Sequence, residues 1–204
     1  MNKKYIFPVI ILLLLGAILL LIPHKDNSQK ELSAEQLLLE MNGISRFFST
    51  EKVADMMINK DPSLLLIDVR PQEKYKEFHL PGAINIPIDS FLTETWKPYL
   101  NQIAMNNIFY SNGTSLADAA WMICRRQNFN NNYVLEGGLN AWVETVLKPE
   151  KPVTDNPSEE FNKYQQQKGA SIFFGGGDAG AESNITAPVP KVQVKKKKKV
   201  QGGC

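Results

Sequence analysis

Short apolar runs that alternate with helix-forming stretches constrain the fold of this chain more than any other feature. Residues Ser63–Val69 read SLLLIDV, a continuous apolar run of the kind expected for a strand buried on both faces. Ile108–Tyr110 and Asn132–Gly138 indicate two further strands, and Ala83–Ile86 indicates a shorter one. Strands that alternate with helices in this way predict an α/β domain with a parallel sheet.

Six helical stretches are expected around these strands. Ser33 and Ser49 are candidate N-caps, and Pro71 stands where a proline favours the opening of a helix. The expected helices are, in chain order, Ser33–Met41, Ser49–Pro62, Arg70–Phe78, residues 89–106, Leu116–Asn128 and Leu139–Leu147.

The N-terminal segment carries no charge from Tyr5 to Pro23. A run of roughly 17–25 apolar residues can cross a bilayer, whereas a cleaved signal peptide has an apolar core of about 7–15 residues. We therefore predict an uncleaved signal anchor over residues 1–24, with a cleaved signal peptide as the alternative. Two lysines and the terminal amine precede the run, against Lys25 and Lys30 after it. This balance predicts a periplasmic or otherwise extracytoplasmic body.

Charge is distributed unevenly along the chain. The net charge is +2, but without the six lysines of residues 191–204 it would be −4. Five of these lysines are consecutive: Lys195, Lys196, Lys197, Lys198 and Lys199. Such a run predicts contact with an anionic lipid surface, and a merely solvated tail is the alternative. No nucleic-acid partner is expected for a body outside the cytoplasm.

The segment after Leu147 changes in composition. A Pro-containing linker leads to SEEFNKYQQQK, which reads as one helix capped by Ser158, and the sequence then becomes rich in Gly, Ala and Pro. The expected organisation is therefore an anchor (1–24), a spacer (25–47), the α/β domain (48–147), a linker with a short helix (148–168) and a disordered tail (169–204).

The chain has two cysteines, Cys124 and Cys204, too few for a disulfide framework or a zinc site. We expect no metal and no cofactor. Cys124 shares an apolar helix face with Ala120, which predicts a buried structural thiol. Cys204 follows two glycines and the lysine run, which would favour its thiolate. It is a hypothetical reactive thiol, disulfide partner or attachment point; the alternative is that it has no role.

Three stretches, in this order, resemble the rhodanese (sulfurtransferase) domain: LLLIDVRPQEKYKEFHLPGAINIP, IFYSNGTSLADAAW and NYVLEGGLNAW. The most specific residues are Asp68, Arg70, Tyr75, His79, Pro81, Gly82, Ala83, Asn85 and Pro87. The resemblance covers about half of the chain. It implies a doubly wound α/β fold, with a parallel sheet flanked by helices.

The resemblance also implies a catalytic cysteine at the start of the loop after the strand Asn107–Tyr110. In the family this thiol takes sulfur from a donor as a persulfide and passes it to a nucleophilic acceptor. Backbone N–H groups that converge at a helix N-terminus stabilise an anion there and lower a thiol's pKa. In this sequence Ser111 stands at that position. The loop also lacks the basic residue often found there, and it is about one residue shorter than the usual loop.

A serine hydroxyl cannot form a persulfide, and it acts as a nucleophile only beside a base. The resemblance assigns His79 to a turn at the sheet edge, so Ser111 is expected to be inactive. The loop is instead a candidate anion- or ligand-binding site made of Ser111, Asn112, Gly113, Thr114, Ser115 and Leu116. Gly113 would permit a tight turn, and Thr114 or Ser115 would cap the next helix. The alternative is that these residues cap the helix and bind nothing.

The sequence thus predicts a membrane-anchored rhodanese-like protein that lacks sulfurtransferase activity and acts as a binding or scaffolding module for a small anion or an unidentified protein. The alternative is a rhodanese-type sulfurtransferase or thiol-relay protein in which Cys204, or a thiol of a partner, replaces the missing cysteine. A third interpretation is that the tail is the functional part and the domain is a folded spacer.

Overall fold

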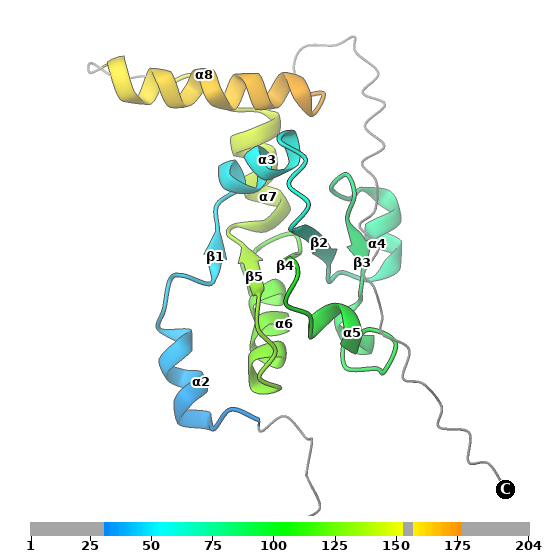
Figure 1. The fold of residues 1–204 in the computed structure, drawn as a ribbon. Coiled ribbons are helices and arrows are strands. Elements are labelled where there is room, and N and C mark those ends of the chain that lie inside the picture. Colours follow the sequence, from blue (N-terminus) through cyan, green and yellow to red (C-terminus); the bar gives the residue numbers. More distant parts are fainter. Residues whose placement is uncertain (1–30, 153–156, 177–204) are drawn as a thin grey trace, which may run out of the picture. The chain divides into compact units, whose positions relative to one another are not determined.

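A computed structural model of the chain describes residues 31–152 and 157–176 (Figure 1). These residues build a five-stranded sheet in the order β1-β5-β4-β2-β3, and every neighbouring pair is parallel. The strands are β1 Phe47–Phe48, β2 Leu64–Asp68, β3 Ile84–Asn85, β4 Asn106–Tyr110 and β5 Asn132–Leu135. The predicted parallel α/β sheet is confirmed. The two-residue β1, which pairs with β5 at the sheet edge, was missed because it is too short to show a pattern.

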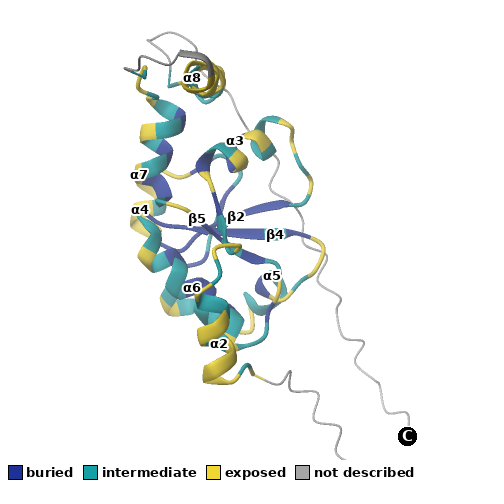
Figure 2. Ribbon diagram, turned by 90° about the vertical axis from the view of Figure 1, so that its left-hand side faces the viewer, coloured by how far each residue is buried: buried dark blue, intermediate teal, exposed yellow. Residues whose placement is uncertain are grey.

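Helices cover both faces of the sheet (Figure 2). They are α2 Ala34–Met41, α3 Thr50–Ile58, α4 Gln72–Glu77, α5 Lys97–Leu100, α6 Thr114–Arg126, α7 Gly138–Trp142 and α8 Pro157–Phe173, with a 3₁₀ turn at Ile88–Ser90 and a π-helical turn at Val143–Leu147. Ser33 and Ser49 cap α2 and α3 as expected, each accepting a backbone N–H of the first turn.

The helix predicted over residues 89–106 is wrong for most of its length. Only the four residues of α5 and the end of the 3₁₀ turn are helical within it. Asn101, at φ −111° and ψ 62°, ends α5. The side chain of Gln102 then binds both the N–H and the carbonyl of Met105, at 2.8 and 3.2 Å. A side chain that pairs with nearby backbone in this way competes with continuation of the helix.

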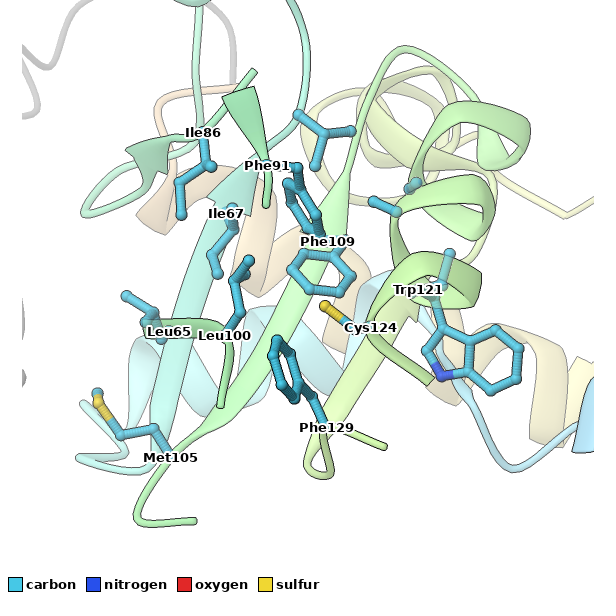
Figure 3. Close-up of a cluster of buried hydrophobic side chains, with 14 residues drawn as sticks. Leu65, Ile67, Ile86, Phe91, Leu100, Met105, Phe109, Trp121, Cys124 and Phe129 are labelled. Carbon is cyan, nitrogen blue, oxygen red and sulfur yellow. The ribbon is translucent and has the colours of Figure 1, made fainter. Parts of the chain in front are cut away.

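Side chains of β2 alternate between two apolar clusters, one on each face of the sheet. Leu65 and Ile67 enter a cluster with α6, and Figure 3 shows Phe109, Phe129 and Cys124 side by side within it. Leu64 and Leu66 enter the other cluster, which includes residues of α3 and α7. The predicted burial of Cys124 is confirmed, and burial raises the pKa of its thiol.

Helix α8 extends beyond the boundary predicted at residue 168. It continues to Phe173, so the expectation of disorder from residue 169 is wrong for the first residues of that segment. Ala170 and Phe174 pack against the cluster that holds α3 and α7, and the Ser171 hydroxyl donates to the Leu147 carbonyl at 2.7 Å. The Gly- and Ala-rich composition predicted disorder. The contacts of Ala170, Ser171 and Phe174 hold the segment on the domain, and local composition gives no indication of them.

Among the described residues, no helix is long and apolar enough to cross a membrane. The predicted anchor at residues 1–24 lies outside the described residues and stays a prediction. The lysine run and Cys204 also lie outside them.

Candidate functional site

A cavity of about 360 Å³ opens where β2 and β4 end. Asp68 and Tyr110 are the paired last residues of these two neighbouring strands, so the segments that follow them meet at one edge of the sheet. The cavity is lined by Arg70, Pro71, Lys74, Ser111, Asn112, Gly113, Ser115 and Leu116. Five of the six predicted loop residues therefore line one cavity, with three residues that sequence reasoning did not assign to it. Ligands of parallel sheets bind at the carboxyl ends of the strands. Arg70, Pro71 and Lys74 could have been assigned to the cavity on this ground, because they follow the end of β2.

The backbone carbonyls of Ser111, Asn112 and Gly113 all accept hydrogen bonds from groups of the protein. The N–H of Leu139 donates to the carbonyl of Ser111, and the N–H of Asn140 donates to that of Asn112, both at 2.9 Å. The hydroxyl of Ser111 itself donates to the Gly113 carbonyl at 2.6 Å. Ser111 is only 4% exposed. Its side chain therefore closes the loop on itself, and its proton is held by a backbone oxygen.

Gly138 packs directly against the backbone carbonyls of the loop. Its φ of +60° is strained for any residue with a side chain, and a Cβ there would stand 2.5 Å from the Ser111 carbonyl oxygen and 2.8 Å from that of Gly113. The Gly137–Gly138 turn that follows β5 is thus packed directly against the loop that follows β4.

Thr114 does not line the cavity. Its hydroxyl accepts the N–H of Gly137 at 2.9 Å, which ties the start of α6 to the same glycine turn. The expectation that Thr114 or Ser115 caps α6 is wrong, because the helix begins at Thr114 and Gly113 is its N-cap, with no side-chain capping bond.

The N–H groups of the loop stand in contrast to its carbonyls. Within residues 31–152 and 157–176, the N–H groups of Asn112 and Gly113 find no protein acceptor. The N–H groups in the first turn of any α-helix lack an acceptor in the preceding turn, and α6 begins directly after the loop. Unpaired amides beside a helix N-terminus are the arrangement that binds anions in proteins.

Arg70 connects the loop to β2 through a buried ion pair. Its Nε and Nη2 lie 3.0 and 2.6 Å from the carboxylate of Asp68, which is fully buried. Nη2 also donates to the Phe78 carbonyl at 2.6 Å, and Nη1 donates to the Asn112 side-chain oxygen at 2.9 Å. Burial opposes the charge of Arg70, but its hydrogen bonds with Asp68 outweigh this and raise its pKa. Arg70 is therefore charged and fixes the position of Asn112.

Lys74 supplies a second positive charge at the cavity, from α4 rather than from the loop. Its side chain is half exposed and pairs with Glu77 at 2.8 Å. An exposed pair of this kind is weak, so the Lys74 ammonium can turn toward a ligand at little cost. The basic residue that the loop sequence lacks is thus compensated by a neighbouring element.

The cavity lining contains no histidine and no carboxylate. His79 does not reach it: its Nδ1 lies 2.9 Å from the Tyr75 carbonyl oxygen, and its ring stacks on that of Tyr75 with 4.0 Å between centroids. Lys74 is therefore the one side chain of the lining that could accept a proton, and the proton of the Ser111 hydroxyl is held by the Gly113 carbonyl.

The other residues of the most specific motif also hold the framework. The amide of Asn85 donates to the carbonyls of Asp68 and Arg70 at 2.9 and 2.8 Å. The Tyr75 hydroxyl donates to the Ala83 carbonyl at 2.7 Å. The described residues contain no group of three metal-binding side chains.

Comparisons with known proteins agree with this fold. The family model of the Rhodanese-like domain matches residues 49–145. The Centrosomal protein of 41 kDa from Gallus gallus is 33% identical over 117 residues, which cover 52% of this chain and 31% of that protein. The thiosulfate:glutathione sulfurtransferase from Saccharomyces cerevisiae is 26% identical over 107 residues, which cover 47% of this chain and 76% of that enzyme.

Among solved structures, the BH2092 protein from Bacillus halodurans matches with a TM-score of 0.45 at 25% identity, covering 53% of this chain and 78% of that one. This chain spans only about a third of the length of several of the curated relatives it matches, among them the Gallus gallus protein and a tRNA uridine(34) hydroxylase from Buchnera aphidicola, of which it covers 31% and 33%.

Proposed function

Residues 49–145 of this chain form a rhodanese-like domain, and from this we propose that the protein is a membrane-anchored binding module that has lost sulfurtransferase activity. The observation that carries the proposal is the state of Ser111. The resemblance aligns Ser111 with the cysteine of the family, and the Ser111 hydroxyl donates its proton to the Gly113 carbonyl at 2.6 Å.

The chemistry of sulfur transfer supports this assignment. In the reaction with thiosulfate, a thiolate attacks the outer sulfur, a new S–S bond forms, and sulfite leaves with the electrons of the broken S–S bond. A hydroxyl does not ionise near neutral pH without a strong base beside it. The cavity lining has no imidazole and no carboxylate, and its lysine, Lys74, is paired with Glu77 at 2.8 Å. Cys124 cannot substitute, because it is fully buried with a raised pKa.

We propose that the cavity binds a small oxyanion or a carboxylate of a protein partner. The amides of Asn112 and Gly113 have no acceptor among the described residues, and the start of α6 adds the positive end of the helix dipole. Lys74 and the charged Arg70 line the same cavity. The backbone carbonyls of Ser111, Asn112 and Gly113 each accept a hydrogen bond from another group of the protein. The backbone groups that the loop offers to a ligand are therefore N–H donors.

Titration of the ¹⁵N-labelled full chain in detergent with thiosulfate tests the binding function. We expect saturable shifts of the amide signals of Ser111–Leu116, and weaker affinity in Lys74→Gln. The matched control is Lys76→Gln, on the same helix but outside the cavity lining. If the amide signals of the loop do not shift, the loop does not bind thiosulfate. If the two lysine variants and the parent chain bind with equal affinity, Lys74 has no role in binding.

A thiocyanate assay with thiosulfate and cyanide tests the loss of activity. We expect no turnover above background from the parent chain. Turnover that disappears in Cys204→Ser would contradict the proposal and establish the thiol-relay alternative instead. The proposed anchor at residues 1–24 is tested by flotation of the full chain with liposomes.

A further inference from the structure

The chain contains two Asn–Gly dipeptides, Asn42–Gly43 and Asn112–Gly113, and both asparagines are exposed. In such a pair the backbone nitrogen of the glycine can attack the side-chain carbon of the asparagine, because glycine has no Cβ to hinder the approach. The attack closes a succinimide ring and releases ammonia, and water then opens the ring to leave a carboxylate. The two sites share the same dipeptide, so a difference in their reactivity reports the folded structure around each.

In the first dipeptide the attacking nitrogen is held by a hydrogen bond. Asn42 ends α2 with a helical backbone, at φ −75° and ψ −14°. The N–H of Gly43 donates to the carbonyl of Glu40 at 3.0 Å. That carbonyl oxygen would also stand 3.2 Å from a Cβ at Gly43, so the backbone is closely packed there. Attack on the Asn42 side chain requires this hydrogen bond to break, and folding should therefore slow the reaction.

In the second dipeptide the attacking nitrogen is free of such a bond. The carbonyl of Asn112 accepts the N–H of Asn140 at 2.9 Å, which fixes the peptide unit between Asn112 and Gly113. In a trans peptide the N–H points opposite to the carbonyl, so the Gly113 N–H points away from Asn140. It has no acceptor among the described residues, and a Cβ at Gly113 would meet nothing within 4 Å. The nitrogen of Gly113 is thus accessible as well as unbonded.

Arg70 activates the side chain that this nitrogen would attack. Its Nη1 donates to the side-chain oxygen of Asn112 at 2.9 Å, while its Nη2 pairs with buried Asp68 at 2.6 Å. When the nitrogen attacks Cγ, the side-chain oxygen gains negative charge. A charged donor already placed at that oxygen stabilises the tetrahedral intermediate. No described residue donates to the side-chain oxygen of Asn42, so the first dipeptide lacks this activation.

Water supplies the other reactants of the step. Hydroxide removes the proton of the Gly113 N–H, and the nitrogen forms a bond to Cγ of Asn112. The bond from Cγ to Nδ2 then breaks, and Nδ2 leaves as ammonia with a proton taken from water. The deprotonated amide that starts the reaction is an anion, which the positive end of α6 and the nearby Lys74 ammonium stabilise. The features that favour an anion in the cavity therefore also favour this reaction.

We propose that Asn112 is a site of spontaneous deamidation, and that the modification weakens anion binding by the loop. Aspartate at residue 112 would place a carboxylate beside Arg70 and among the N–H donors of the loop. Isoaspartate would in addition insert one methylene group into the backbone between β4 and α6. Both products repel an anionic ligand. The effect on binding rests on the proposed function of the cavity, whereas the deamidation itself does not.

The test of the modification compares the two asparagines within one sample. The full chain in detergent is incubated at mildly alkaline pH in water enriched in heavy oxygen, once folded and once unfolded in urea. Peptide mass spectrometry then measures the rate at which each site gains a labelled aspartate or isoaspartate. The unfolded chain gives the rate of each dipeptide without the influence of the fold.

We expect the ratio of the folded rate to the unfolded rate to be several-fold higher at Asn112 than at Asn42. Equal ratios, or a higher ratio at Asn42, would overturn the proposed modification. Thiosulfate should slow deamidation at Asn112 and leave that at Asn42 unchanged, because a bound anion occupies the N–H donors of the loop. A fast reaction at Asn112 that thiosulfate does not slow would overturn the link to anion binding and leave the modification standing.

The consequence for binding is tested with Asn112→Asp, which reproduces the aspartate product. Its affinity for thiosulfate should be several-fold weaker than that of the parent chain. The matched control is Asn42→Asp, which adds the same charge outside the cavity lining and should bind like the parent chain. Equal affinity of Asn112→Asp and the parent chain, or an equal loss in both variants, would overturn the effect on binding. A parent chain that binds no thiosulfate would overturn the anion site itself, and the comparison of the two asparagines would still decide the modification.

Discussion

The two sides of the loop from Ser111 to Leu116 differ in how their polar groups are used. On the inner side, the carbonyls of Ser111, Asn112 and Gly113 all accept hydrogen bonds, and Gly138 packs so closely that a methyl group would not fit. On the outer side, the amides of Asn112 and Gly113 have no acceptor among the described residues, and a Cβ on Gly113 would meet nothing within 4 Å.

The difference shows that the loop is held in place by the domain itself. A donor array that is fixed before binding loses little entropy when an anion arrives, which is the basis of preorganised anion sites. The support behind the loop does not depend on the identity of the side chain at residue 111 beyond one hydrogen bond. The proposed anion site therefore does not require a thiol at residue 111.

The largest expected effect comes from breaking the support under the loop. Arg70→Met should lower the free energy of unfolding by about 3–5 kcal/mol, because it leaves the buried carboxylate of Asp68 without its partner. Urea denaturation measures this. The double variant Asp68→Asn with Arg70→Met should lose less than Arg70→Met alone. A loss below about 1 kcal/mol in Arg70→Met would show that the ion pair does not support the domain.

The inner side is tested next by Gly138→Ala. The new methyl group would stand 2.5 Å from the Ser111 carbonyl oxygen at a backbone φ of +60°. Strain and displacement of the loop should lower the free energy of unfolding by about 1–3 kcal/mol. The amide signals of Ser111–Leu116 should shift even without a ligand. A variant as stable as the parent chain, with an unchanged loop spectrum, would contradict close packing on this side.

Gly169→Ala is the matched control, because it measures the effect of an added methyl group on stability at a position with free space. Gly169 lies inside α8, and a Cβ there would meet nothing within 4 Å. Gly169→Ala should raise the free energy of unfolding by up to about 1 kcal/mol, because alanine favours the helix. Denaturation monitored by circular dichroism measures the gain. If stability does not change, α8 unfolds separately from the rest of the domain.

The smallest expected change in stability is that of Gly113→Ala on the outer side. Its backbone, at φ −129° and ψ −164°, is open to any residue. A gain from the less flexible unfolded chain is offset by the weaker capping of alanine, so stability should stay within about 0.5 kcal/mol. Affinity for thiosulfate should nevertheless fall, because Gly113 lines the cavity. Unchanged affinity would place the ligand elsewhere.

The sheet and the supporting motif were predictable because their signals are local. Leu64–Asp68 is a continuous apolar run that fills clusters on both faces, and the predicted strand differs from the observed one by a residue at each end. The turn after β4 was also expected, because a turn between a buried strand and a helix has a distinct composition, but it ends at Gly113 and not at Leu116, since α6 begins at Thr114.

The remaining features depend on contacts between segments distant in the sequence. Lys74 enters the cavity only because β2 and β4 are neighbours, and its position in α4 gives no indication of this. Residues 170–174 are ordered by contacts with Leu147 and the apolar cluster beneath, against their local composition. The hydrogen bond of Ser111 to Gly113 is set by the side-chain conformation, which the sequence does not reveal.

We propose that the loop from Ser111 keeps the geometry of a sulfur-transfer site and lacks only the cysteine thiol. The most direct test of this claim restores the thiol: Ser111→Cys in the Cys204→Ser background is treated with thiosulfate and analysed by intact-mass and peptide mass spectrometry. We predict that the introduced thiol gains one sulfur atom as a persulfide and that cyanide removes it as thiocyanate, while the Cys204→Ser chain gains none. A folded Ser111→Cys chain that takes up no sulfur, or a persulfide on the parent chain itself, would contradict the account.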